Sequence, residues 1–388
     1  MNRLRDVLGR AVVPTLALVT AFLVGAVLLV LTDFDHLKDL GTDPLAALGG
    51  AVGLAIRGYG AMLSGAIGDP GRIVAAVQSG SDRDVGRAIR PATEALLSAT
   101  PLLFICLGLA VALHARLFNF GAEGQFALGG LGAVMGAVAL EGIVPAFVIL
   151  PVALLVGTLF GAAYGFVPGL LKARTGAHEV ITTLMLNTIA AQIVLFVLHS
   201  GALSNNVASI ASVPRIFDLP TIRLDWGLAV ALVMAAVTSF VIFRTRLGFE
   251  LRATGFSRTA ARAAGMRPGR ATVLALSMSG GLVGLGGAFL ALGPAGGISG
   301  SRDGFVALAL ALIAGLRPSG IVVMALLYAA LNNGAKTMVI ETGTPLDLLV
   351  VVIALTLAFV AAPGLIRSMW RLKDPGPLPT ADGAHHPQ

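Results

Sequence analysis

A polar run interrupts a long apolar stretch of the chain at residues 119–125. It reads Asn-Phe-Gly-Ala-Glu-Gly-Gln, so two amides, one carboxylate and two glycines lie within seven residues. A carboxylate in so apolar a setting is costly to bury and usually faces a cavity or a partner. Asn119 and Glu123 are also residue types that cap a helix start by accepting hydrogen bonds from free backbone N–H groups. Two roles therefore stay open for Asn119, Glu123 and Gln125: lining a solute path or capping a helix.

A second polar group follows at Glu179, Thr183 and Asn187. These residues are four apart, so on a helix they share one face. Such side chains can hold helices together by hydrogen bonds worth ~0.6 kcal/mol each, or they can form a polar wall along a path. We favour the path for Thr183 and Asn187, and the helix start for Glu179.

The sequence lacks the motifs of several enzyme classes. No G-x-x-x-x-G-K-[ST] loop is present, and the run at residues 333–337 has the wrong spacing to bind ATP. His178-Glu179 is not followed by a second histidine at metalloprotease spacing, and no G-x-S-x-G occurs. We therefore expect transport and not catalysis, with no metal site and no cofactor held by this chain itself.

Composition predicts membrane helices as the elements that position these side chains. Hydrophobic residues make up 56% of the 388 residues and charged residues 12%, with a mean hydropathy of +0.89. These values exclude an ordinary soluble globule. Because a bilayer core needs about 20 apolar residues per helix, the sequence predicts one all-α, polytopic membrane domain over residues 1–388. About ten spans are expected, near 12–32, 94–115, 123–140, 145–170, 178–200, 226–243, 271–292, 303–316, 318–335 and 346–366. The eighth is short enough to be a partial or broken helix.

Arginines set the expected orientation of these spans. Residues 244–270 hold seven arginines and one acid between two apolar segments. Basic residues gather in cytoplasmic loops, so this loop and both chain termini are expected in the cytoplasm. The same rule accounts for the net charge of +7 without a nucleic-acid partner.

Two segments fall outside the span pattern. Residues 33–92 carry mixed charge, and Arg57 interrupts their apolar stretch. An arginine at mid-bilayer costs at least ~2.5 kcal/mol, so we expect an external or interfacial segment there. The tail at residues 371–388 is proline-rich and is expected to be a disordered cytoplasmic segment.

Small residues predict close helix packing. Glycines recur every fourth position along one predicted span, and a second span repeats the spacing; they are Gly157, Gly161, Gly165, Gly169, Gly280 and Gly284. This spacing lets helix backbones approach closely where lipid supplies no hydrophobic drive.

Three stretches together resemble the permease subunits of ABC importers, in the group of ribose, branched-chain amino acid and nucleoside permeases. Residues 119–125 resemble the family's N-I-G-A-E-G-Q run and depart from it at Phe120. Residues 179–187 match its E-V-I-T-T-L-M-L-N run throughout. Residues 252–265 resemble its cytoplasmic coupling segment, although Ser257-Arg258-Thr259 replaces the usual Asn-Pro-Glu-like turn.

The resemblance extends from about Pro91 to Leu365 and is greatest for nucleoside or simple-sugar permeases. It implies a type II-like importer fold in a bacterial cytoplasmic (inner) membrane. It also implies the assembly: a second permease subunit, expected to be a different chain, a cytoplasmic ATPase that binds ATP and magnesium, and an external substrate-binding lipoprotein.

The resemblance places the ATPase contact in the arginine-rich loop. A short helix over residues 257–264 would lie in a groove of the ATPase. The expected coupling residues are Arg252, Ala253, Gly255, Arg258, Ala260, Ala261, Arg262 and Gly265. Ala260, Ala261 and Gly265 would permit close approach, and Arg258 and Arg262 would form a basic face. The competing role for this loop is anchoring to lipid headgroups.

The function expected on this basis is a permease that forms the path for nucleosides or related ribosyl solutes by alternating access. A monosaccharide or branched-chain amino acid permease is the alternative within the class. An ion-coupled secondary transporter would need inverted repeats and intramembrane ion sites, for which the sequence offers little support. A membrane enzyme is the remaining alternative, and the sequence contains no cluster of catalytic residues that supports it.

Overall fold

Helices form nearly all of the chain in this computed structural model. The structure describes residues 2–33, 37–201, 212–216, 222–294, 296–298 and 303–371. Over those ranges no strand forms, and one isolated antiparallel bridge joins Arg215 to Asp225. The predicted all-α class is confirmed. The predicted disordered tail lies, after Arg371, outside the described residues.

The chain folds into two compact units, a division that composition does not show. One consists of Met1–Gly60 with Val339–Gln388, and the other of Ala61–Met338. The two helices α3 (Pro44–Ile67) and α15 (Pro318–Thr342) contribute residues to both.

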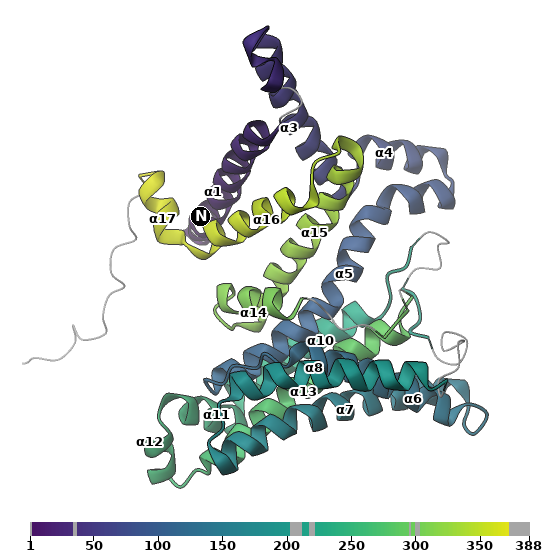
Figure 1. Cartoon of the computed structure of the whole chain (residues 1–388), viewed down its shortest axis with the longest axis vertical. Coiled ribbons are helices and arrows are strands. Elements are labelled where there is room, and N and C mark those ends of the chain that lie inside the picture. The colour runs from purple at the N-terminus through teal and green to yellow at the C-terminus, as the bar shows by residue number, and fades with distance from the viewer. Residues whose placement is uncertain are drawn as a thin grey trace, which may run out of the picture. The chain divides into compact units, whose positions relative to one another are not determined.

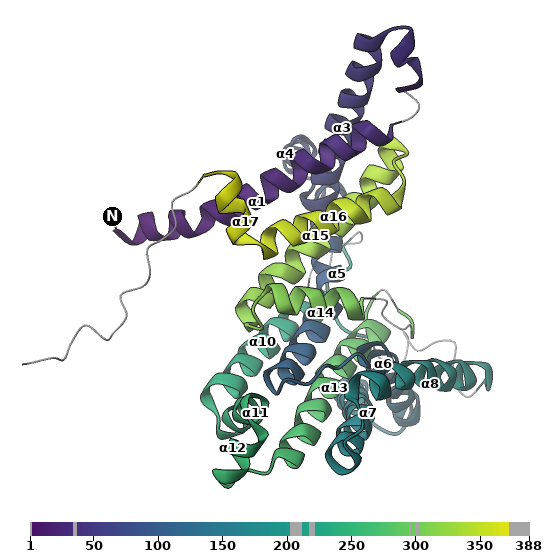
Figure 2. The ribbon, with the colours of Figure 1, turned by 60° about the vertical axis from the view of Figure 1, so that its left-hand side comes forward.

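The first unit is built around α1 (Asn2–Thr32) and α16 (Leu346–Ala361), which pack side by side (Figures 1 and 2). Tyr59, in α3, donates a hydrogen bond of 2.9 Å to the carbonyl oxygen of Phe22 in α1. The short helices η1 (Lys38–Gly41) and α17 (Pro363–Met369) complete this unit.

The last predicted span is bent. The sequence predicts one span over residues 346–366, but α16 ends at Ala361 and α17 continues at an angle of 89° to it. Pro363 is the first residue of α17, and a proline cannot donate the backbone hydrogen bond that would continue α16. Trp370, just after α17, donates to the hydroxyl of Thr20 in α1 at 2.9 Å, which holds the bent end against α1.

In the second unit, α13 is surrounded by α5, α6 and α7 (Figure 2). The helices of this unit, besides parts of α3 and α15, are α4 (Pro70–Ser79), α5 (Asp82–His114), α6 (Ala122–Leu140), α7 (Ala146–Thr175), α8 (Glu179–His199), α10 (Gly227–Arg244), α11 (Arg246–Phe256), α12 (Arg258–Ala263), α13 (Pro268–Leu292) and α14 (Gly304–Ile313). The helices α5, α6 and α13 are largely buried, whereas most residues of α7 and α8 are partly or fully exposed.

The predicted glycine stripe is confirmed as a backbone-to-backbone packing surface between α7 and α13. A methyl group on Gly161 would collide with the carbonyl oxygen of Gly280, and one on Gly165 with that of Leu276. A methyl group on Gly157 would lie 2.5 Å from the carbonyl oxygen of Gly129 in α6. Small residues at this spacing therefore bring three helices into direct backbone contact.

Nine helices in the described ranges are long and apolar enough to span a membrane, or ten if α16 and α17 form one span. The chain is thus a multi-pass membrane protein of the predicted kind. With ten residues, α14 is too short to span, which confirms the prediction of a partial helix. The set of nine includes α3, inside the segment 33–92 that the sequence places outside the bilayer. Its external or interfacial position therefore stays a prediction.

One buried carboxylate lies at the start of α10. Asp225 is 3% exposed, and its Oδ1 accepts a hydrogen bond of 2.8 Å from the backbone N–H of Gly227. Burial raises the pKa of Asp225 to about 6, although the bond from Gly227 opposes that shift. The ionised form is therefore disfavoured in the folded protein.

The first prediction concerns the α7–α13 contact. We expect Gly161→Ala to lower the melting temperature of the purified protein in detergent, because forcing a methyl group between two backbones costs about 1–3 kcal/mol. Gly281→Ala is the matched control, since a methyl group there would lie 3.4 Å from Cβ of Ala162, an ordinary contact. Equal melting temperatures for the two variants would contradict this packing.

The second prediction concerns pH. The pKa of an unfolded aspartate is near 3.9, about 2 units below the pKa of Asp225 in the folded protein. Protonation of Asp225 therefore favours the folded state, and the free energy of unfolding rises by about 3 kcal/mol as the pH falls from above 6 to below 4. Asp225→Asn should raise the melting temperature at pH 8 and reduce the difference in melting temperature between pH 8 and pH 5. Asp347→Asn, at an exposed position in the first turn of α16, is the control. An unchanged pH profile in Asp225→Asn would show that this carboxyl does not supply the pH dependence.

Candidate functional site

The predicted polar run lies at a break between α5 and α6. Residues 115–121 join the end of α5 to the start of α6 without helical structure. Asn119 donates a hydrogen bond of 2.9 Å to the hydroxyl of Ser279 in α13. Ser279 is 11 residues after the start of α13 and 13 before its end. The break therefore lies at the middle of the bundle, and α6 starts there.

Side-chain amides satisfy the backbone of this break. Oδ1 of Asn119 accepts from the N–H of Gly121 at 3.0 Å. From α8, Oδ1 of Asn187 accepts from the N–H of Gly124 at 2.9 Å, and its Nδ2 donates to the carbonyl oxygen of Phe120 at 2.7 Å. At membrane depth, where water is excluded, backbone groups outside a helix need such partners inside the protein.

The structure brings the predicted polar residues together and buries most of them. Nδ2 of Asn119 donates to Oε1 of Gln125 at 2.8 Å, and Nε2 of Gln125 donates back to Oδ1 of Asn119 at 3.2 Å. Asn119 is 2% exposed, Gln125 1% and Thr183 0%. The Thr183 hydroxyl donates to the carbonyl oxygen of Glu179 at 2.7 Å. In this conformation Asn119 and Gln125 hold the break in place, whereas the Thr183 hydroxyl is satisfied within α8; the role of all three in lining a path stays a prediction.

A second interrupted segment meets the first. The half-length helix α14 begins at Gly304, where a methyl group would lie 3.0 Å from Cγ of Glu123 in the first turn of α6. The carbonyl oxygen of Ala307 accepts a hydrogen bond of 3.3 Å from the thiol of Cys106, eight residues before the end of α5. Two helices therefore begin next to each other in the interior, and Glu123, which is half-buried, lies between their starts.

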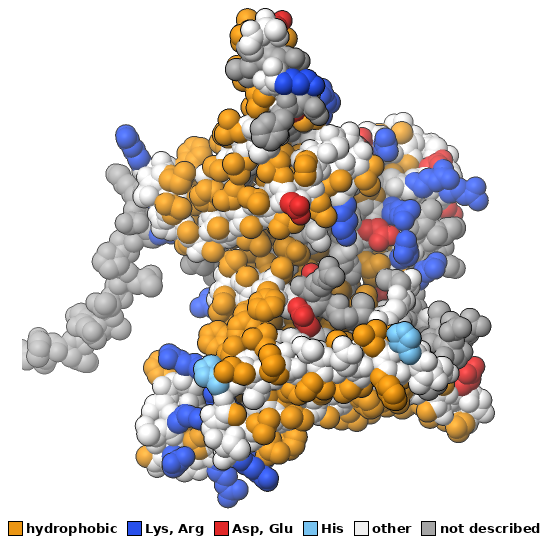
Figure 3. All heavy atoms as spheres, in the orientation of Figure 1, with side chains coloured by type: hydrophobic (Ala, Val, Ile, Leu, Met, Phe, Trp, Pro, Cys, Tyr) orange, Lys and Arg blue, Asp and Glu red, His pale blue; other side chains and the backbone are white. Residues whose placement is uncertain are grey.

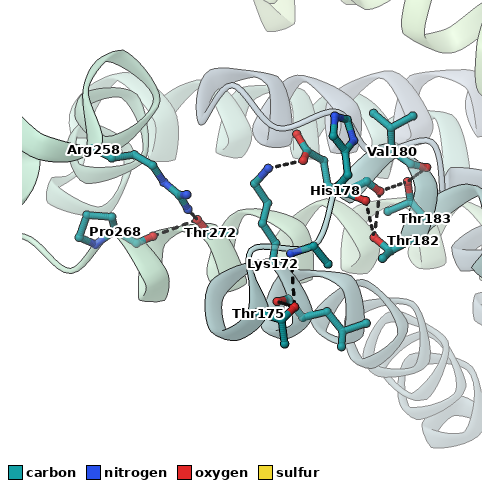
Figure 4. Close-up of polar contacts among 12 residues, drawn as sticks. Lys172, Thr175, His178, Val180, Thr182, Thr183, Arg258, Pro268 and Thr272 are labelled. Carbon is teal, nitrogen blue, oxygen red and sulfur yellow. Dashed lines mark hydrogen bonds and ion pairs between the residues drawn. The ribbon is translucent and has the colours of Figure 1, made fainter.

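The predicted start of α8 at Glu179 is confirmed, and it carries an ion pair that the sequence did not predict. The Glu179 carboxylate binds the ammonium group of Lys172, in the last turn of α7 (Figure 4). The two side chains are 8% and 19% exposed. The pair closes the tight turn between α7 and α8. It thereby fixes the first turn of α8, on the helix face that carries Thr183 and Asn187.

The predicted short helix at residues 257–264 is confirmed as α12. The Ser257 hydroxyl caps it by accepting from the N–H of Ala260 at 3.2 Å. The helix stops at Ala264, and Gly265 follows with a φ of +81°, a conformation that glycine adopts without strain. The guanidinium of Arg258 donates to the Thr272 hydroxyl at 2.8 Å, so α12 is tied to the start of α13 (Figure 4).

Several predicted coupling residues act inside the chain in this structure. Ala261 is 3% exposed and faces inward, so it does not offer the close approach to a partner that the sequence suggests. Gly255 packs against the end of α5, where a methyl group would lie 2.7 Å from the carbonyl oxygen of His114. Arg252 donates to the carbonyl oxygen of Gly248 at 3.3 Å and lies over the ring of Phe243.

The outward face of α12 is formed by the remaining coupling residues. Ala260, Arg262 and Gly265 are exposed, and the guanidinium group of Arg258 reaches back toward α13. Figure 3 shows Lys and Arg side chains gathered around α11 and α12, beside the apolar surface of the other helices. The role of this face in docking stays a prediction.

A cavity that the sequence did not predict lies behind this loop. It has a volume of roughly 450 Å³ and is lined by residues of α5, α11 and the α14–α15 turn, among them Arg116, Ala253, Phe256 and Leu316. Arg116 lies over the ring of Phe256, 5.2 Å from its centroid. Phe256 is 140 residues from Arg116 along the chain, so tertiary packing and no local sequence pattern brings the two together.

Known proteins that are similar in sequence to this chain are transporter permeases. Residues 92–361 match the profile of the family described as branched-chain amino acid transport system / permease component. A guanosine ABC transporter permease protein of Bacillus subtilis is 35% identical over 299 residues, covering 73% of this chain and 84% of that protein. A nucleoside ABC transporter permease protein of Lactococcus lactis is 31% identical over 72% of this chain and 81% of its own length. A glucose ABC transporter permease protein of Haloferax volcanii is 31% identical over 69% and 75%.

The third prediction tests the role of Asn187 at the break. Asn187→Leu would leave the Gly124 N–H and the Phe120 carbonyl oxygen without partners, at about 1–3 kcal/mol for each buried group. We expect a lower melting temperature in detergent and reduced solute uptake. Asn187→Asp keeps only the acceptor and should be intermediate.

Thr188→Val, at the next and exposed position of α8, is the matched control. If Asn187→Leu melts like this control while uptake changes, Asn187 acts on the solute and not on the backbone of the break.

Proposed function

The chain belongs to the family described as branched-chain amino acid transport system / permease component, and from this premise we propose that it is the permease subunit of an ATP-driven importer for nucleosides or related ribosyl solutes. The observation that carries the proposal is the pair of interrupted segments at mid-bundle, with polar groups at a depth where a span would otherwise be continuous. Guanosine and nucleoside permeases among the relatives support the solute class.

We infer the partners from two features of the chain: its sequence lacks a nucleotide-binding loop, and its helix α12 has an exposed face. Its sequence has no nucleotide-binding loop, so ATP and magnesium would be bound by a separate cytoplasmic ATPase. The outward face of α12 would dock on that ATPase. A second permease subunit, expected to be a different chain, would complete the path, and an external lipoprotein would deliver the solute. In this proposal the arginine-rich loop and both termini would lie on the cytoplasmic side of the bacterial inner membrane.

The contacts of α12 suggest how ATPase movement would reach the path. Arg258 joins α12 to Thr272 of α13, and α13 binds Asn119 of the break through Ser279. Arg116 joins Phe256, at the end of α11, to the other end of the break. An ATPase that binds one position of α12 more tightly would thereby favour one conformation of residues 115–121.

A monosaccharide importer is the second candidate, because the glucose permease relative is 31% identical over most of its length. Uptake measured in cells that express the complete transporter separates the two. We expect guanosine and uridine to compete for uptake of labelled nucleoside, and glucose not to compete. Uptake that survives ATP depletion but stops with an ionophore would contradict an ATP-driven importer.

The fourth prediction separates ATPase docking from lipid anchoring of the arginine-rich loop. Arg262→Glu, on α12, should reduce co-purification of the ATPase by on the order of tenfold, because a reversed charge at an interface opposes association. Arg270→Glu, in the first turn of α13, makes the same charge change outside α12 and should have little effect. Similar losses in both variants would favour headgroup anchoring, since that attraction depends on the net charge of the loop and not on the position of each arginine.

A further inference from the structure

Burial alternates along the break between α5 and α6. Ala115, Leu117 and Asn119 face inward and are 7%, 4% and 2% exposed. The residues between them face outward: Arg116 is exposed, Phe118 is 42% exposed and Phe120 is half-buried. Arg116, with a φ of +53°, ends α5 in a left-handed turn, and from there to Phe120 burial alternates, so that the segment has one packed face and one open face.

The open face continues as a row of aromatic rings. The centroids of Phe118 and Phe120 are 6.1 Å apart with nearly parallel planes. Phe305, in the first turn of α14, follows at 5.6 Å from Phe120 and is 56% exposed. We name Phe118, Phe120 and Phe305 the aromatic row. It crosses from one interrupted segment to the other at the point where α6 and α14 begin.

Lipid is excluded as the neighbour of Phe118 and Phe120. Non-helical backbone within the hydrocarbon region occurs only where it is buried in protein or lines a water-filled cavity. Residues 115–121 are non-helical, and Asn119 places them at the level of Ser279, near the middle of α13. The rings of Phe118 and Phe120 project from this backbone, so their open face adjoins an aqueous path or another protein chain.

We propose that the aromatic row is the surface on which the base of a nucleoside stacks as it crosses the membrane, an inference that rests on the proposed importer function. A base presents a flat π face whatever its identity, so stacking on phenylalanine accepts purines and pyrimidines alike. Phenylalanine offers no hydrogen bond, so the row selects for an aromatic ring and not for a particular base.

A carboxylate beside the aromatic row suits the sugar of a nucleoside. Glu123 lies between the starts of α6 and α14, next to Gly304 and thus one residue from Phe305. A carboxylate accepts hydrogen bonds from sugar hydroxyls. A flat apolar surface with a hydrogen-bond acceptor at its side matches a base joined to a sugar.

The test measures uptake by the complete transporter in cells. Phe305→Leu and Phe118→Leu remove the ring but keep apolar bulk, and each should raise the KM for guanosine and uridine by on the order of tenfold. Phe305→Trp keeps a stacking surface and should stay close to the wild-type KM. Phe166→Leu, which removes a ring of 44% exposure from the regular helix α7, is the control and should leave KM unchanged.

The outcomes separate this inference from the proposed function. If the wild type imports nucleosides and neither leucine variant changes KM, the aromatic row does not bind the base. If a leucine variant instead loses the second permease subunit on purification, the row is a subunit interface and the inference is wrong. If the wild type imports no nucleoside, the proposed function fails and this inference falls with it.

Discussion

The need to satisfy backbone groups where water is excluded determines how the second unit of this protein is built. Residues 115–121 leave the helix near the middle of the bundle, and those of their N–H and carbonyl groups that lack a backbone partner would be unpaired in hydrocarbon. Asn119 supplies one partner from within the break, and Asn187 supplies two from α8. The position and the amide chemistry of these two residues follow from that need. So does the turn between α7 and α8, because the Lys172–Glu179 pair holds the end of α8 that carries Asn187.

An interrupted helix of this kind separates two tasks within one segment. The inward face of the break, through Asn119, binds Gln125 and Ser279 and keeps the backbone in place. The outward face presents aromatic rings and an arginine, and those side chains are free of the structural hydrogen-bond network. Substitutions on the outward face can therefore alter what the segment recognises without removing the contacts that position it.

Local signals in the sequence predicted some elements well. The family resemblance predicted a short helix at residues 257–264, and the structure shows the local cause of its bounds: Ser257 caps α12, and Gly265 follows it in a left-handed conformation. The glycine spacing predicted close helix packing, since its period is that of one helix face, but it did not predict that α7 and α13 are the partners. The partners of Asn187 and Asn119 lie 67 and 160 residues away along the chain, and only tertiary packing identifies them. The inward direction of Ala261 likewise depends on how α12 packs, and its small size alone suggested an outward role.

The glycine contact between α7 and α13 also limits how the molecule can move. At Gly161, Gly165 and Gly280 backbone meets backbone, so a change of rotamer there would not let one helix slide past the other, and the two helices would tend to shift together. The helix α13 has 25 residues and is about 38 Å long at 1.5 Å per residue. Its first turn is tied to α12 by Arg258, and its last residue adjoins Gly293, which packs against Asp225. With α7 packed along it, α13 would carry a displacement of α12 along its length to the far end of the bundle.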